Sequence, residues 1–353
     1  QYLQLGASNP DATGEFHKNT MISYLGRINY SFMDKYIITA NFREDGSSRF
    51  AKGNKWGFFP SVSGAWVITN EDFFPQDIIL NYLKLRMGYG QIGNQNIENN
   101  AYIDQVRNTY RYPFGNLLAT GLATYAPGNR NVKWETTEDF SIGIDGGLFN
   151  NSLTWTVDLY MRKTNDMLLK NPVPGYSGMY SSPTDLNSGI WDNVGSIENK
   201  GLEISLEYRG NIGELKYRVG GNMSFVKNEI TELGTVDFIT SANVRGLGDI
   251  SRSEVGSSVG RFWGYKTSGL FQSQAEIDAY KNKDGELIQP KAKPGDLKYI
   301  DRNGDGQITD TDKAWIGDPL PTFTAGFNIN LEYKGFDLRA YFNGVCGNDN
   351  MDA

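Results

Sequence analysis

Apolar and polar side chains alternate residue by residue along eight separate segments of this chain. In one of them, Ile204 and Leu206 share one face, whereas Glu203 and Glu207 share the other. A period of two is that of a β-strand with one apolar and one polar face. The eight segments are 21–32, 36–43, 83–89, 153–162, 202–209, 215–225, 323–333 and 336–343. The pattern predicts an all-β fold.

A soluble β-sandwich and a membrane barrel both place one strand face against something apolar, so alternation alone does not separate them. Three features favour a membrane-spanning antiparallel β-barrel. The segments run to about ten residues, the length that a tilted strand needs to cross a bilayer. Aromatic residues often close the apolar faces, as aromatic girdles do. No charged residue interrupts those faces, where one would cost roughly 2–4 kcal/mol at mid-bilayer.

The connections between these segments are of two kinds. Tight connections fall at 33–35, 147–151, 210–214 and 334–335, and long ones at 44–55, 92–133, 164–196 and 228–321. Short periplasmic turns and long extracellular loops are typical of outer-membrane barrels. If the tight turns are periplasmic, the excursion 228–321 lies outside the cell or contains an even number of further crossings. Within it, Ser273 and Glu276 have the spacing of a capping box that opens a short helix.

Composition excludes several classes of function. With 34 basic and 41 acidic residues, the net charge of -7 provides no basic field for nucleic acid. One Cys and one His cannot build a disulfide framework or a multi-Cys/His metal centre. Gly88–Gly93 satisfies GxGxxG but runs into a polar loop instead of a helix. Ser258 of a GxSxG pattern lies far from the single histidine, His17. No catalytic residue is predicted, and the chain is not expected to be an enzyme.

Several longer stretches carry a resemblance to a known family; they are 30–74, 83–95, 131–150, 193–206, 264–273 and 295–344. Together they resemble the SusC/RagA-type TonB-dependent transporters of Bacteroidetes outer membranes. The resemblance covers essentially the whole chain and implies the C-terminal part of a parent barrel of about 22 strands, a size class with a plugged lumen. The plug and the TonB-contacting segment would then lie outside residues 1–353, and both ends of the chain look cut.

The resemblance implies active import of oligosaccharides or oligopeptides across the outer membrane, driven by the TonB complex and assisted by a SusD-like lipoprotein lid. Two other functions stay open. One is a soluble or surface-anchored calcium-dependent β-sandwich binding module; the other is a siderophore- or cobalamin-type receptor without a lipoprotein. Loop aromatic rings could stack on sugars or pack on peptides, and they could equally pack loops together. The candidate ligand-binding residues are Trp191, Tyr176, Tyr180 and Trp263.

Residues 301–312 have the ligand spacing of an EF-hand calcium loop. The candidate metal ligands are Asp301, Asn303, Asp305, the carbonyl of Gln307, and Asp312 in place of the usual Glu. Gly306 would permit the sharp turn that the loop requires. No long flanking helices are evident, so the prediction is a rigid calcium (Ca2+) staple and not a switch. The alternative is an Asp/Asn/Gly turn without an ion.

Overall fold

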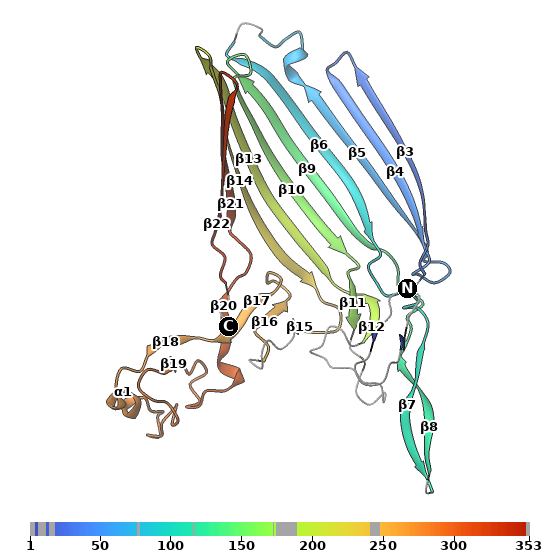
Figure 1. Ribbon diagram of the computed structural model, residues 1–353, viewed down its shortest axis with the longest axis vertical. Coiled ribbons are helices and arrows are strands. Elements are labelled where there is room, and N and C mark those ends of the chain that lie inside the picture. The colour runs from blue at the N-terminus through green and yellow to red at the C-terminus, as the bar shows by residue number, and fades with distance from the viewer. Residues whose placement is uncertain are drawn as a thin grey trace.

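Ten antiparallel strands form one continuous sheet, as Figure 1 shows. The computed structural model describes residues 4–5, 12–13, 18–75, 78–115, 117–171, 173, 189–240 and 248–350. The ten strands are β3 (Met21–Phe32), β4 (Tyr36–Ser47), β5 (Trp56–Val67), β6 (Leu80–Asn94), β9 (Glu135–Leu148), β10 (Leu153–Asn165), β13 (Ser196–Ile212), β14 (Leu215–Glu232), β21 (Phe323–Tyr333) and β22 (Phe336–Cys346). Each pairs with the next of these strands along the chain, so the sheet is a meander with β3 and β22 at its open edges. The all-β prediction is confirmed.

The hydrogen-bond register places the apolar side chains of all ten strands on one face. Ile204 on β13 lies opposite Val157 on β10 and Met223 on β14. On the other half of the sheet, Leu85 of β6 lies opposite Ile144 of β9. A one-residue slip would move every side chain to the opposite face, so this register defines the face across the whole sheet.

The apolar face is exposed, which is not how a soluble sheet is arranged. Ile204 is 39% exposed and Leu206 50%, although both lie near the middle of β13. Within the described residues no second sheet covers this face, so the β-sandwich alternative is wrong. The apolar medium for this face is the hydrocarbon of a bilayer, where backbone groups must pair within the sheet as they do here.

Connection length separates the two ends of the sheet. At one end the strands are joined through 33–35, 68–79, 149–152, 213–214 and 334–335; at the other, through 48–55, 95–134, 166–195 and 233–322. The short connections gather at the top of Figure 1 and the long ones at the bottom. The strands extend further toward the long-connection end than predicted: β14 continues to Glu232, five residues into the predicted excursion. Backbone pairing continues there after the apolar alternation has ended.

A conventional hydrophobic core lies at the long-connection end. Its members are Phe50, Phe59, Ile97, Ala101, Val132, Trp134 and Leu168. Trp134 lies between two rings, 5.3 Å from that of Phe50 and 5.4 Å from that of Phe59. Its indole N–H donates to the carbonyl of Lys55 at 2.9 Å. This core fixes the loops to the rim of the sheet.

Short elements fill the remaining connections. They are β1 (Gln4–Leu5), β2 (Ala12–Thr13), η1 (Ile68–Asn70), β7 (Gln105–Phe114), β8 (Leu117–Ala126), β11 (Leu168–Asn171), β12 (Ile190–Asn193), β15 (Phe238–Thr240), β16 (Ser251–Glu254), β17 (Arg261–Tyr265), β18 (Thr267–Leu270), α1 (Gln274–Ala279), β19 (Leu297–Tyr299), η3 (Asp310–Asp312) and β20 (Lys313–Gly317). One half of the predicted capping box of α1 is present, since the Ser273 hydroxyl accepts from the Glu276 N–H, while the Glu276 carboxylate accepts from the N–H of Gln272. Among the described residues, no helix is long and apolar enough to span a membrane.

The face assignment is tested by two neighbouring lysine substitutions. Ile204→Lys places a charge on the apolar face at mid-strand and should cost roughly 2–4 kcal/mol in a bilayer. Ser205→Lys places the same charge on the polar face and should assemble at the wild-type level. The measurement is the amount of folded, heat-modifiable protein in outer-membrane fractions. Equal assembly of the two variants would contradict the assignment.

Candidate functional site

The polar face of the sheet carries a charge network centred on Arg86. Its guanidinium donates twice to the Asp145 carboxylate, both at 2.8 Å, and to both carboxylate oxygens of Asp158, at 3.0 and 3.2 Å. Lys84 Nζ lies 2.9 Å from the same Asp145 carboxylate. The Asp158 carboxylate fills the space that a side chain at Gly143 would need, since a Cβ there would lie 2.0 Å from it. Two positive and two negative charges therefore neutralise each other on the wall of the sheet.

A groove of about 950 Å³ lies on the polar face near the tight turns. It is lined by charges of both signs, including Glu207, Arg218, Lys216 and Glu332. The ion pairs there are exposed: Arg218 Nε is 3.6 Å from Glu207, and Lys216 Nζ is 3.2 Å from Glu332. The groove lies on the polar face of the sheet, which is the face that lines the lumen in a membrane barrel.

Of the four predicted ligand-binding aromatics, the structure describes two, Trp191 and Trp263, and these pack in different places. Trp191 on β12 packs against the hydrophobic core, with Lys170 Nζ 5.4 Å from the centre of its ring. Trp263 on β17 packs edge-on against Trp315 at 4.9 Å. Tyr176 and Tyr180 lie outside the described residues. Ligand binding by these four residues stays a prediction.

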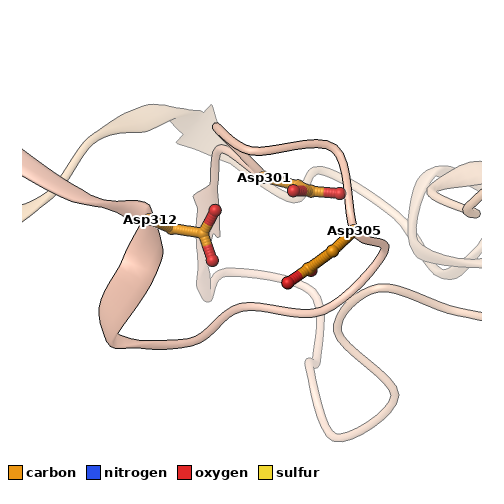
Figure 2. Close-up of side chains that lie close together, drawn as sticks. All are labelled: Asp301, Asp305 and Asp312. Atoms are coloured by element: carbon orange, nitrogen blue, oxygen red, sulfur yellow. The ribbon is translucent and has the colours of Figure 1, made fainter.

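The loop 301–312 brings three of the predicted metal ligands together. Carboxylate oxygens of Asp301, Asp305 and Asp312 lie within 4.8 Å of one another. Figure 2 shows the three side chains converging from different parts of the loop. Asn303 lies beside them, because its side-chain oxygen accepts from the Asp305 N–H at 2.9 Å. The Gln307 N–H donates to the Asp305 carboxylate at 2.9 Å.

Asp301 organises the first half of this loop. Its carboxylate accepts from the N–H groups of Gly304 at 2.7 Å and Gly306 at 2.8 Å. Gly306 has φ +87°, a conformation that glycine adopts without strain. A Cβ at Gly306 would also lie 2.6 Å from the side chain of Asn282. Both the positive φ and the lack of space for a side chain therefore favour glycine at this position.

Asp312 closes the loop from the other side and is 1% exposed. Its carboxylate accepts from the N–H groups of Thr309 and Arg302, both at 2.8 Å, and of Asn303 at 3.2 Å. The Thr309 hydrogen bond, together with those from Arg302 and Asn303, holds the pKa of Asp312 below its ordinary value, while burial acts in the opposite direction. Thr309 and Asp312 form a reciprocal capping box at η3. The sequence analysis missed Thr309, although the T-x-x-D spacing signals it.

In the described part of the chain, no histidine lies beside Ser258 of the GxSxG pattern to act as its base. The Ser258 hydroxyl donates to the Asp318 carboxylate at 2.6 Å, which joins two loops. The Gly88–Gly93 pattern lies inside β6, where glycines suit the crowded strand: the Phe59 ring occupies the space above Gly93. His17 lies outside the described residues.

Comparison with known proteins decides the family. Residues 2–345 match the profile described as TonB dependent receptor-like, beta-barrel. The chain belongs to this family. TonB-dependent receptor P26 of Formosa agariphila is 36% identical over 343 residues, which are 96% of this chain and 33% of that protein. TonB-dependent receptor SusC of Bacteroides thetaiotaomicron is 34% identical over 340 residues, covering 92% of this chain and 31% of SusC.

A solved structure gives the same result for the fold of this TonB-dependent receptor barrel. A chain of the RagAB peptide transporter matches with a TM-score of 0.72 at 27% identity, covering 93% of this chain and 34% of that one. The chain thus spans about one third of the length of the relatives that it matches. The predicted SusC/RagA-type resemblance and the outer-membrane location are confirmed.

Acid should loosen the loop 301–312 through Asp312. Folding lowers the pKa of Asp312, so the ionised carboxylate stabilises the loop at every pH above its ordinary pKa of 3.8. This stabilisation is lost as the pH falls through the lower pKa of the folded state. Hydrogen exchange of residues 300–315, corrected for intrinsic rates, should therefore rise only at strongly acidic pH. Asp312→Asn should be less protected at neutral pH and respond much less to acid. An unchanged acid response in that variant would contradict this role.

Proposed function

We propose that the chain forms the barrel wall of an active outer-membrane importer for oligosaccharides or oligopeptides. It would act with a SusD-like lipoprotein lid and the TonB complex, as a transporter and not as an enzyme. The supporting observation is the similarity, over more than nine-tenths of this chain, to SusC and to a chain of the RagAB peptide transporter. The siderophore- or cobalamin-type alternative has no comparable support.

The two ends of the sheet suit different tasks in such an importer. The long connections 48–55, 95–134, 166–195 and 233–322 would form the mouth of the barrel, meaning its extracellular opening, and would contact the lipoprotein lid. The polar face of the sheet would line the lumen through which cargo passes. Charges on that face pair with one another, as Arg86 does with Asp145 and Asp158. Internal pairing keeps the wall hydrated without a strong net field, which suits cargo that is polar but of varied charge.

Import is tested in cells that lack the protein. Uptake of one labelled cargo class, an oligosaccharide mixture or an oligopeptide mixture, should be lost and restored by the gene. A Glu207→Gln, Arg218→Gln double variant should assemble normally but change uptake, because both side chains line the polar groove. Ile28→Leu on the apolar face is the matched control and should leave uptake unchanged. The proposal would be overturned if cells without the protein took up both mixtures at the wild-type level and the natively purified protein carried no lipoprotein.

We further propose that the loop 301–312 binds calcium as a structural staple. Three carboxylates converge there, and Asn303 and Gln307 stand at the ligand spacing of an EF-hand loop. Several carboxylate oxygens already accept backbone N–H bonds, so the loop is organised before an ion binds. An extracellular position, with Asp312 in place of the usual bidentate Glu, favours a modest affinity, with a dissociation constant of about 10⁻⁴ M.

Calcium binding is measured by titration calorimetry on the intact, detergent-purified protein after chelation. Wild-type protein should bind one ion in this range, and calcium should slow proteolysis at residues 301–312. Asp301→Asn combined with Asp305→Asn should remove both effects, because it removes two charged ligands. Asp284→Asn, an exposed position outside the cluster, should retain them. Equal heats from the wild type and the double variant would refute the staple.

A further inference from the structure

The small sheet at the mouth carries a row of arginine and aromatic side chains. Strands β15, β16, β17 and β20 form this sheet in that order, beside the long-connection ends of β14 and β21 (Figure 1). In its register, Arg252 of β16 lies directly opposite Arg261 of β17, and Trp263 lies opposite Trp315 of β20. Neighbours in such a ladder share a face of the sheet.

The two guanidinium groups lie against aromatic rings. The Arg252 Cζ atom is 3.9 Å from the centre of the Phe238 ring and 4.7 Å from that of Trp263. The Arg261 Cζ atom is 5.0 Å from the Trp315 ring. A guanidinium held over a ring keeps its donor groups for a partner in its own plane. The row therefore presents two oriented cations at one place.

Only one of the two arginines has an ion-pair partner among the described residues. Like charges that lie directly opposite each other destabilise a strand pair. Arg252 has a partner, since its Nη2 lies 3.0 Å from the Glu254 carboxylate. Across the described ranges, no carboxylate lies within 4.0 Å of the Arg261 guanidinium. Arg261 is therefore without an ion-pair partner among the described residues.

Three buried polar atoms on these strands also lack a hydrogen-bond partner: Nε of Arg252, Nε of Arg261 and the hydroxyl of Thr240, which lies opposite Arg252. Buried polar atoms are nearly always paired, so three in one small sheet require a cause such as a missing ligand or ion. The unpaired atoms of Thr240 and Arg252 are additional to the missing ion pair of Arg261, and they lie at the same place.

We propose that this face binds a carboxylate of the cargo, with Arg261 as its anchor and with Trp263 and Trp315 as the flat walls beside it. The two oxygens of a carboxylate match the two parallel N–H donors of a guanidinium. Because Glu254 already pairs with Arg252, one further carboxylate would pair with Arg261. The carboxylate belongs either to a peptide C-terminus or to an acidic sugar. The inference depends on the proposed import function only in taking the ligand to be cargo.

The test is calorimetry on the intact, detergent-purified protein with two matched ligand pairs. One pair is the peptide Gly-Gly-Phe as free acid and as C-terminal amide; the other is trigalacturonate and neutral maltotriose. One of the charged ligands should bind about ten- to a hundredfold tighter than its uncharged match. The pair that shows this difference identifies the source of the carboxylate.

Variants then assign the effect to Arg261. Arg261→Gln should abolish the preference for the charged ligand, and Arg261→Lys should restore only part of it, because lysine keeps the charge but not the fork. Lys283→Gln makes the same charge change at an exposed position elsewhere in the excursion and should retain the preference. Heat-modifiability checks that each variant is folded.

Two results would overturn the site: equal binding of charged and uncharged ligands by the wild type, or an undiminished preference in Arg261→Gln. The wild-type comparison decides even if a variant fails to fold. Uptake by cells is measured separately. If the wild-type protein binds the carboxylate ligand but cells do not import it, that result would count against the proposed import function and not against this site.

Discussion

Backbone pairing within the sheet is the constraint on which the rest of the structure depends. In a bilayer nothing else can satisfy the N–H and C=O groups of ten strands, so the strands must pair with one another in a fixed register. That register then places Val157, Ile204 and Met223 in one row on the lipid side. The same register brings Arg86, Asp145 and Asp158 together on the polar side, where they neutralise one another.

The protein consequently uses two kinds of apolar environment. The strands need no core of their own, because lipid covers their apolar face. The long connections lie in water and are built like a soluble protein, with Trp134 packed between two phenylalanines and Asp312 buried with its hydrogen bonds satisfied. Among the described residues, seven buried side-chain atoms have no hydrogen-bond partner, and three of them, on Thr240, Arg252 and Arg261, lie on the small sheet of β15, β16, β17 and β20.

Alternation in the sequence predicted most of the strands because each has a lipid side and a polar side. It did not single out β5 or β9. In β9, glycines interrupt the pattern: Asp158 occupies the space at Gly143, and the Trp155 ring occupies that at Gly146. The ends of strands such as β14 were also predicted too early, because pairing continues beyond the lipid. Ligand spacing predicted the convergence of the loop carboxylates. It could not predict the Arg252–Arg261 contact, since the register of strands of four or five residues is set by tertiary packing.

The central claim is that the two faces of the sheet meet lipid and water, respectively, and cysteine scanning along β13 tests it most directly. The chain has a single cysteine, Cys346, which is exposed. Replacing it with serine gives a cysteine-free variant into which single cysteines can be introduced. Single cysteines at 203–208 would be treated with a charged, water-soluble maleimide in intact outer membranes. Labelling at 203, 205 and 207, with little at 204, 206 and 208, is the predicted result. Uniform labelling, or the opposite alternation, would contradict the account.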